Sequence, residues 1–196
     1  MTDTMIDAPA EAASDAEAEG TALAAAATAA GLRVLASADW PESAADRTAP
    51  PIAGFVVSSF SPLAAEVARR CLTRSQPAGP SADRPVTAVV LVSPLGDLAG
   101  AVHVAEAVDS GGRVGPLLFF QAVPNAVAGH VAALWQLTGP VVCVGDTRSG
   151  LEVAALLLAD RDADRALLIR VDQAHTAGAD DRAAAVLLHD PEGEQL

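Results

Sequence analysis

Aromatic residues and cysteine are scarce in this sequence, and lysine and tyrosine are absent altogether. It holds four phenylalanines, two tryptophans and two cysteines among 196 residues. With so few aromatic side chains, the core has to be built from alanine, valine and leucine, which pack well but supply few rigid anchors. Cys71 and Cys143 have neither metal-ligand spacing nor a paired framework. This excludes a disulfide-stapled scaffold, predicts no metal site and favours the reduced cytoplasm.

Positive charge is also scarce, because all 12 basic residues are arginine while 25 residues are acidic, giving a net charge of −13. Nucleic acids bind cationic faces, so this charge excludes them as partners and argues equally against anionic membranes. No basic region precedes an apolar run at the amino terminus, and no apolar run reaches the length of a membrane span, about 18 residues. We therefore expect a soluble cytoplasmic protein.

The composition divides the chain into one domain with loose ends. Residues 1–30 mix alanine with aspartate and glutamate and offer little apolar surface to offset the entropy of ordering, which predicts a disordered acidic tail. Within it, Thr21–Ala30 is rich enough in alanine to form either a weak helix or more of the tail. We expect the ordered domain over residues 31–190 and a flexible end over 191–196.

Strand and helix patterns alternate along the domain. Val86–Val92 is a nearly continuous, β-branched apolar run, typical of a strand covered on both faces of a parallel sheet. The alternation predicts an α/β fold with a mostly parallel five-stranded sheet and helices on its faces. The other expected strands are Gly31–Ser37, Val141–Val144, Ala166–Val171 and Arg182–His189; the expected helices are Ser61–Thr73, Asp97–Val108, Asn125–Leu137 and Ser149–Asp160.

Three arginines lie near the carboxyl end of the first of these helices. At that end of a helix, cations interact favourably with the macrodipole. We interpret Arg69, Arg70 and Arg74 as a solvated helix end.

The most informative stretch runs from Val123 to Ala155. It contains Val-Pro-Asn-Ala-Val-Ala-Gly-His, then Leu-Thr-Gly-Pro, a β-branched run and Gly-Asp-Thr-Arg-Ser-Gly-Leu-Glu-Val-Ala-Ala. This succession resembles the amino-terminal half of a β-ketoacyl synthase of the thiolase-like fold. In that family the strand-to-helix turn carries a cysteine two residues before a Ser-Gly or Ser-Ser pair. Here Thr147 stands in that place.

The resemblance implies that this turn lacks the family's nucleophile. A cysteine at a helix amino terminus has a lowered pKa, whereas a threonine hydroxyl needs an adjacent general base to react. The family's two catalytic histidines lie in the carboxyl-terminal half of the fold, beyond Leu196, and none of the histidines here matches them: His103, His130, His175 and His189. We therefore expect no acyl loading, no catalytic residue and no cofactor.

The neighbours of Thr147 have structural interpretations. Asp146 could serve as a base, but adjacent residues at a turn usually point apart, so we favour Asp146 or Thr147 as the cap of the helix that follows. Cys143 lies inside the apolar strand, where burial keeps a thiol protonated and inert. Arg148 is a departure, because the family generally has a small residue there.

In its short length and its lost cysteine, the chain resembles one branch of the family. Chain-length-factor subunits of type II polyketide synthases replace the cysteine and act as heterodimeric partners, and a short form in aryl polyene pathways resembles only the amino-terminal half. The resemblance covers Gly31 to Asp190 and is most specific from Phe119 to Leu151. It implies a non-catalytic subunit that pairs with an active β-ketoacyl synthase, and that meets an acyl carrier protein only indirectly.

The resemblance also implies an interface. In thiolase-like dimers, the equivalents of the Asn125–Gly129 helix and of the strand before the turn lie at the two-fold axis. Small residues suit that close approach, although helix-on-sheet packing within one subunit would explain them equally well. Phe119, Phe120 and Val123 would lie near the end of the partner's acyl tunnel, with core packing as the alternative. The implied interface and tunnel residues are Phe119, Phe120, Val123, Asn125, Ala128, Gly129 and His130.

Two other functions stay open from the sequence. The first is a repurposed enzyme that acts on an acyl thioester through Thr147 or Asp146, which would need a nearby histidine. The second is a homodimeric scaffold protein without acyl chemistry. Half of a pseudo-symmetric fold leaves an apolar sheet face uncovered, and a face of that kind predicts association.

Overall fold

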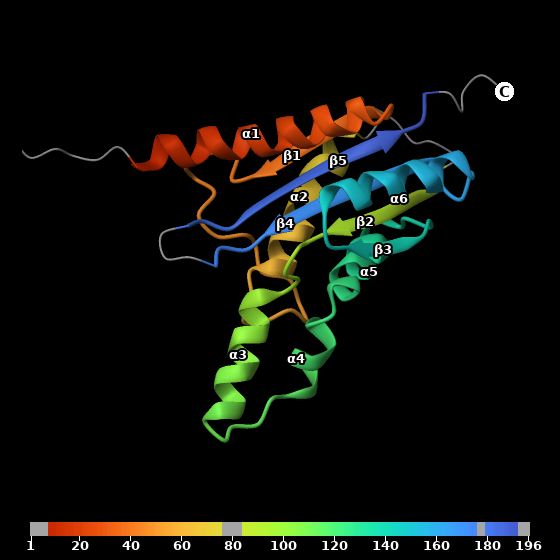
Figure 1. Ribbon diagram of the computed structural model, residues 1–196. Helices are drawn as coiled ribbons and strands as arrows, with labels where there is room; N and C mark the ends of the chain where they lie inside the picture. Colours follow the sequence, from red (N-terminus) through yellow and green to blue (C-terminus); the bar gives the residue numbers. More distant parts are fainter. Residues whose placement is uncertain (1–7, 76–83, 176–178, 192–196) are drawn as a thin grey trace, which may run out of the picture.

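The fold is built on a single sheet of five strands. The computed structural model describes residues 8–75, 84–175 and 179–191. In space the strands follow the order β1-β5-β4-β2-β3 (Figure 1). Their bounds are β1 Arg33–Trp40, β2 Thr87–Val92, β3 Val141–Val144, β4 Arg165–Asp172 and β5 Arg182–His189. The predicted α/β class and the five predicted strands are confirmed.

The sheet is mixed, so the prediction that it is mostly parallel was not accurate. β2 pairs in parallel with both β3 and β4, whereas β5 is antiparallel to both β4 and β1. The reason is the short connection between these strands, because only residues 173–181 separate the end of β4 from the start of β5. Parallel neighbours need a long crossover, and a direct return of the chain gives an antiparallel pair.

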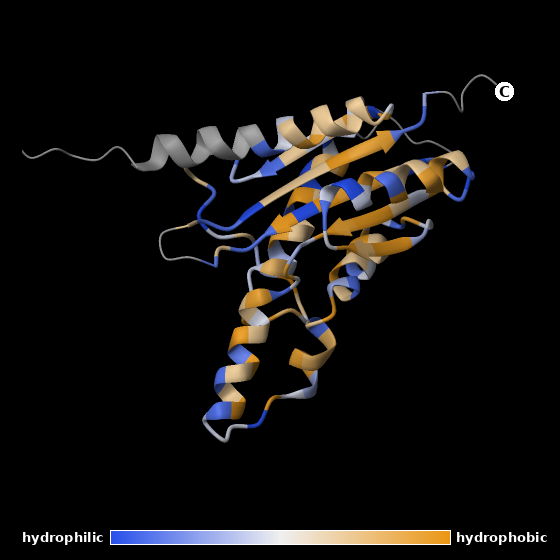
Figure 2. Cartoon of the chain, in the orientation of Figure 1, coloured by the Kyte–Doolittle hydropathy of each residue, from blue (hydrophilic) through white to orange (hydrophobic). Residues whose placement is uncertain are grey.

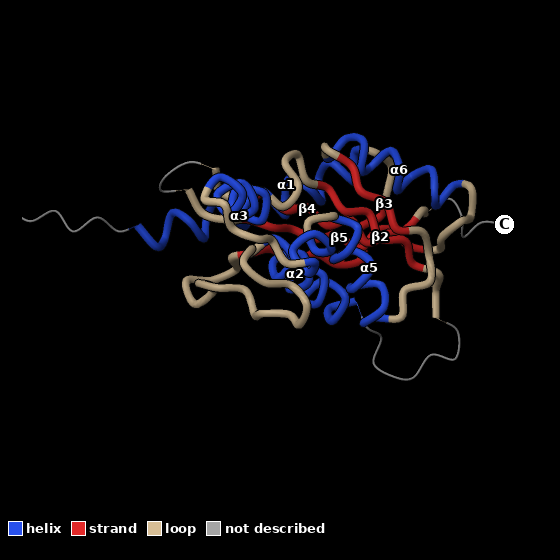
Figure 3. The backbone as a smooth tube through the Cα atoms, turned by 90° about the horizontal axis from the view of Figure 1, so that it is seen from below, coloured by secondary structure: helices blue, strands red, loops and turns tan. Residues whose placement is uncertain are grey.

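Helices cover both faces of the sheet. On one face lie α2 (Phe60–Ser75) and α5 (Pro124–Trp135), and on the other lie α1 (Ala8–Ala29) and α6 (Thr147–Ala159). Seen from below, the strands run between α6 on one side and α2 and α5 on the other (Figure 3). Successive side chains of β2 point to opposite faces of the sheet and so enter the apolar cores on both faces. Val89 and Leu91 pack toward α2 and α5, while Val90 packs toward α6.

The helical alternative for Thr21–Ala30 holds, and α1 extends it back to Ala8 through residues for which we predicted a disordered tail. α1 contacts β1 and β5, and its Leu23 and Ala27, one turn apart, are buried in the same core as Val34 and Leu188. An alanine-rich surface lets the helix axis approach the sheet closely, so a stripe with one leucine is enough to dock it. Residues 1–7 lie outside the described part of the chain, as does the predicted flexible end except for Pro191.

Gly20 brings α1 unusually close to β1. A Cβ at this position would collide with the carboxylate of Asp39, and the backbone N–H of Gly20 donates a hydrogen bond to that carboxylate. The pKa of Asp39 is raised to about 6, chiefly by burial beneath the helix. The negative charges of Glu42 and Glu19 also raise it, and the Gly20 hydrogen bond and Arg74 oppose the rise. Relative to the unfolded chain, folding therefore favours the protonated form of Asp39.

This pKa predicts a stabilising substitution. A carboxyl group whose pKa rises from 3.8 to about 6 on folding stabilises the folded state at low pH. This stabilisation is lost as the pH rises through about 6. We expect Asp39→Asn to raise the free energy of unfolding at pH 8 by about 1–2 kcal/mol, a value reduced for partial exposure, and to leave it almost unchanged at pH 4. Urea unfolding of both proteins at the two pH values measures the difference, and an equal effect at pH 4 and pH 8 would contradict this explanation.

Two helices project away from the sheet. These are α3 (Leu98–Asp109) and α4 (Pro116–Gln121), and we call residues 98–121 the arm (Figure 1). α3 confirms the predicted helix, with Asp97 as its N-cap, and α4 forms from an apolar segment to which the sequence assigned no structure. Hydrophobic residues recur along both helices (Figure 2). Yet α3 buries only Gly100 and α4 buries only Gln121.

Candidate functional site

The turn between β3 and α6 is a capped helix start. The Asp146 carboxylate accepts a hydrogen bond from the backbone N–H of Ser149 at 2.9 Å and one from its hydroxyl at 2.7 Å. These bonds confirm the predicted capping role, and the first of them chiefly lowers the pKa of Asp146 below its usual value. A carboxylate held in this way is a poor base for activating Thr147.

In the described part of the chain, no base is hydrogen-bonded to the hydroxyl of Thr147. This residue is the first of α6 and is half-buried. Arg148 extends into solvent and pairs with Glu152 one turn further on, at 2.9 Å. His130 packs edge-on against Phe55, with ring centroids 5.5 Å apart. Asp146, Arg148 and His130 are thus each bound to groups other than the Thr147 hydroxyl.

A small niche lies beside this turn. It has a volume of about 230 Å³ and is lined by Leu91, Ser93, Gly96, Pro124, Cys143, Val144 and Gly145. Cys143 is half-buried at this niche, so the prediction that it belongs to the core was only partly right. Partial burial still raises the pKa of its thiol to about 11, which keeps it protonated and unreactive at neutral pH.

The arm exposes large apolar side chains. Phe119 is 82% exposed and Phe120 is 64% exposed, so the alternative in which both pack in the core is wrong. Val123, just after α4, is half-exposed. The other exposed large apolar residues of the arm and its flanks are Leu95, Val102, Val108 and Leu117. A concentration of apolar side chains on one projection is typical of a protein-binding surface.

α5 has one face in the core and one at the surface. Ala128 is buried with Val127 and Val131, so its small size serves packing within the chain. Asn125 is exposed, and a Cβ added at Gly129 would meet nothing within 4 Å. The small residues predicted for an interface thus divide, with Ala128 in the core and Gly129 on an open surface.

β3 is an edge strand that could accept another strand. Among the described strands it pairs only with β2, and all four of its residues are half-buried. None of them is charged, and natural proteins usually protect an exposed edge with charges, bulges or proline. The edge strand β3 and the arm are the two surfaces of the described chain best suited to binding a partner.

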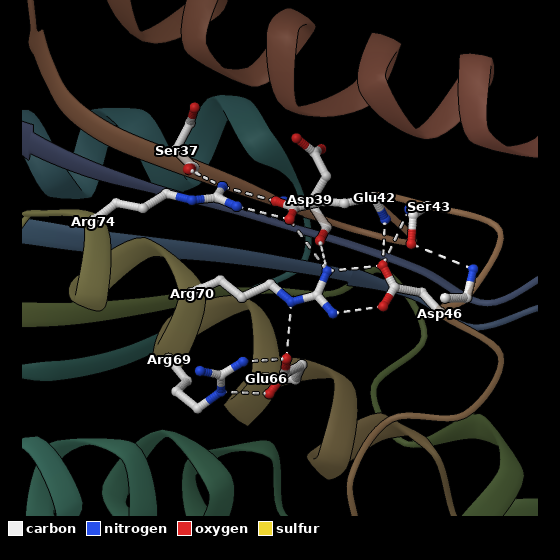
Figure 4. A network of polar contacts seen from close by, with 10 residues as sticks. Ser37, Asp39, Glu42, Ser43, Asp46, Glu66, Arg69, Arg70 and Arg74 are labelled. Atoms are coloured by element: carbon white, nitrogen blue, oxygen red, sulfur yellow. Dashed lines mark hydrogen bonds and ion pairs between the residues drawn. The ribbon is translucent and has the colours of Figure 1, made fainter.

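The arginines of α2 form a network that sequence reasoning missed (Figure 4). Arg70 is only 14% exposed and binds Asp46 through two nitrogens, at 2.9 and 2.7 Å, and Glu66 through Nε at 2.8 Å. Its guanidinium also lies over the Trp40 ring, 4.8 Å from the centroid. The interpretation as a solvated helix end is therefore wrong for Arg70. Asp46 lies 24 residues away along the chain, so no local pattern could have paired it with Arg70, whereas Glu66 is the i,i+4 neighbour of Arg70 on the same helix.

The network neutralises the basic cluster. Arg69 pairs with Glu66 and Arg74 pairs with Glu42, each at 2.7 Å. Hydrogen bonding to Arg70 lowers the pKa of Asp46 to about 2, so the pair stays ionised over the physiological range. The arginines of α2 thus tie the β1–α2 loop to the helix and are committed to carboxylates of their own chain.

The chain resembles ketosynthase structures in its fold. One similar chain belongs to the complex of the ketosynthase ApeO with its chain length factor ApeC from Xenorhabdus doucetiae, at 17% identity over 81% of this chain and 79% of that chain, with a TM-score of 0.60. A second belongs to the ishigamide ketosynthase/chain length factor, at 19% identity over 73% and 46% of the two chains, with a TM-score of 0.58. The chain has a ketosynthase-like, thiolase-type fold. No protein-family model and no curated protein matches its sequence.

The ketosynthase-like fold is shared at low sequence identity. A third structure, the AntDE:AntF complex of a type II acyl-carrier protein with its ketosynthase, matches at 12% identity and a TM-score of 0.60, over 82% of this chain and 63% of that chain. This ketosynthase-like chain therefore spans most of the first similar chain but only about half to two thirds of the other two. The predicted fold, half of a thiolase-like architecture, is confirmed.

The described residues contain neither a metal-binding cluster nor a membrane-spanning helix. Within residues 8–75, 84–175 and 179–191, no three or more His, Cys, Asp or Glu side chains gather in a way that could hold a metal ion. Across the same ranges, no helix combines the length and the apolar character needed to cross a bilayer.

Proposed function

We propose that this chain is a non-catalytic subunit of the chain-length-factor type. It pairs with an active β-ketoacyl synthase and shapes the acyl tunnel of that enzyme during polyketide, polyene or fatty-acid-like chain elongation. The exposed pair Phe119 and Phe120 carries this proposal, because two adjacent phenylalanines on a projecting arm gain stability only when a partner covers them. Several proteins of this fold occur in complexes of a ketosynthase with a chain length factor, which supports the same assignment.

The binding surface combines the arm with the edge of the sheet. β3 offers unpaired backbone groups, and the open position at Gly129 on α5 allows another backbone to approach closely. Asn125 and His130 flank this position on the same helix. In the complex, Phe119, Phe120 and Val123 reach toward the partner's tunnel, where their bulk limits the length of the growing chain.

The net negative charge of this chain favours docking of the acyl carrier protein on the other subunit. The net charge here is −13, and the arginines of α2 are already paired with carboxylates of the same chain. Acyl carrier proteins are acidic, so this surface repels them rather than binding them. The ketosynthase subunit therefore supplies the carrier-protein docking site, and this chain meets the carrier protein only through the complex.

A substitution at the turn tests the non-catalytic role. Because the Asp146 carboxylate caps α6 and no base reaches Thr147, Thr147→Ala should leave the elongation rate of the reconstituted pair within about twofold of the wild-type rate. The assay measures product formation by the ketosynthase alone, with this chain, and with the variant. Omitting the chain should reduce elongation.

One outcome would replace this proposal with the repurposed enzyme. If this chain alone turns over an acyl thioester, and Thr147→Ala abolishes that turnover, Thr147 is a nucleophile. A homodimeric scaffold is a second candidate, because the exposed phenylalanines suit another copy of the chain as well as a different protein. Measuring the mass of the assembly distinguishes these two partners.

A further inference from the structure

The arm is attached to the body of the protein by polar contacts at its two ends. Its helices bury only Gly100 and Gln121, so apolar packing fixes little of their position. Gln121 itself and Asp97, which caps α3 at Gly100, both bond to one short segment, Val56–Ser58, in the loop before α2. This arrangement differs from α2 and α5, which bury apolar faces against the sheet.

The carboxyl-terminal end of the arm is attached to the body through Gln121. Its Oε1 accepts a hydrogen bond from the backbone N–H of Val56 at 2.8 Å, and its Nε2 donates one to the carbonyl oxygen of the same residue. Gln121 is 3% exposed, so both polar ends of the side chain are satisfied by one peptide segment and are shielded from water. Losing either bond would leave a buried polar group without a partner.

The amino-terminal end of the arm is attached to the body through Asp97. Its carboxylate caps α3 by accepting from the backbone N–H of Gly100 at 2.9 Å, and it also accepts from the hydroxyl of Ser58. Gln173, which follows β4, donates to the Ser58 hydroxyl at 3.1 Å and accepts from the backbone N–H of Ala99 at 3.2 Å. The start of α3 is therefore tied both to the loop and to the sheet.

The residue between the two attachment points has an unfavourable backbone conformation. Val57 has a φ of 76°, and a β-branched residue at positive φ is a genuine outlier. Such a conformation persists only where the surrounding structure imposes it. Here Val56 is bound to Gln121 on one side and Ser58 to Asp97 and Gln173 on the other.

We propose that Val56–Ser58 is an anchor that sets the orientation of the arm, with Gln121 and Asp97 as its positioning residues. The anchor holds both ends of a projection that would otherwise be two short helices in water. Helices of 12 and six residues are marginal in isolation, so an arm released from its anchor loses helical structure. The inference concerns this chain alone and does not require the proposed pairing.

Hydrogen exchange of the full-length protein tests the anchor. Gln121→Met removes both bonds to Val56 while keeping the bulk of the side chain, and it should speed amide exchange across the arm about tenfold, with β2 and β4 unchanged. Leu117→Met is the matched control, since it introduces the same side chain at an exposed position of the same helix and should leave exchange at the wild-type rate.

Two outcomes would overturn the proposal. Exchange in the arm could stay at the wild-type rate, which would mean that the contacts to Val56 do not hold it. Alternatively, exchange could rise equally in the arm, β2 and β4, which would make Gln121 an ordinary contributor to global stability. Should Gln121→Met fail to fold, Ser58→Ala provides the second test, because Asp97 still caps α3 while its link to the loop is lost. That variant should speed exchange in α3 relative to β2.

Discussion

Replacing both Phe119 and Phe120 by aspartate is expected to weaken pairing with the ketosynthase at least about a hundredfold while leaving the fold intact. The two rings are 82% and 64% exposed, so the free chain loses almost no packing when they are replaced. In the complex, each buried ring contributes about 1.5–3 kcal/mol, and a charge in its place has to be desolvated as well. Titration of the purified ketosynthase with each variant measures the affinity.

The matched control for this prediction is Leu156→Asp. Leu156 is 59% exposed on α6, on the face of the sheet opposite α2 and α5, so the change adds one negative charge, against two in the double variant, at a similarly exposed apolar position. Its affinity for the ketosynthase should equal that of the wild type. Equal weakening by Leu156→Asp would show a general effect of added negative charge and would remove the arm from the interface.

Removal of the Arg70 side chain is expected to be the most destabilising change among the three arginines of α2. Arg70→Ala leaves the carboxylates of Asp46 and Glu66 without their shared partner and exposes the Trp40 ring that the guanidinium covers. Breaking a largely buried ion pair from one side costs about 3 kcal/mol. For a protein of this size, that corresponds to a fall in Tm of roughly 6–12 °C.

Arg69→Ala provides the comparison on the same helix. Arg69 is 54% exposed and shares only Glu66, so its loss should cost less than about 1 kcal/mol. Both variants are compared with the wild type by denaturant unfolding at pH 7. If the two substitutions cost the same, the network around Arg70 is a set of independent surface pairs and does not brace the β1–α2 loop.

The sequence predicted those parts of the fold that depend on local pattern. Val141–Val144 was found with its bounds unchanged, and the start of the helix after Asp146 followed from cap chemistry. The direction of β5 could not be predicted, because an apolar run has the same composition in a parallel and in an antiparallel pair. The docking of α1 was missed because alanine contacts contribute little to an amphipathic pattern.

The candidate site was predictable at the turn but not at the arm. The prediction that the turn lacks the family's nucleophile rests on one residue, Thr147, in a recognisable motif. The exposure of Phe119 and Phe120 contradicts the usual rule that large apolar residues are buried, and that rule applies to an isolated chain and not to an interface. The anchor at Val56–Ser58 depends on contacts between residues more than 35 positions apart, for which single-sequence patterns carry no signal.

The mass of the assembly formed when this chain is co-expressed with a β-ketoacyl synthase encoded beside it tests the central claim most directly. Native mass measurement should find one complex that contains a single copy of this 19.7 kDa chain for each ketosynthase subunit. A species of twice 19.7 kDa, with the ketosynthase eluting separately, would contradict the pairing and identify the chain as a homodimeric scaffold.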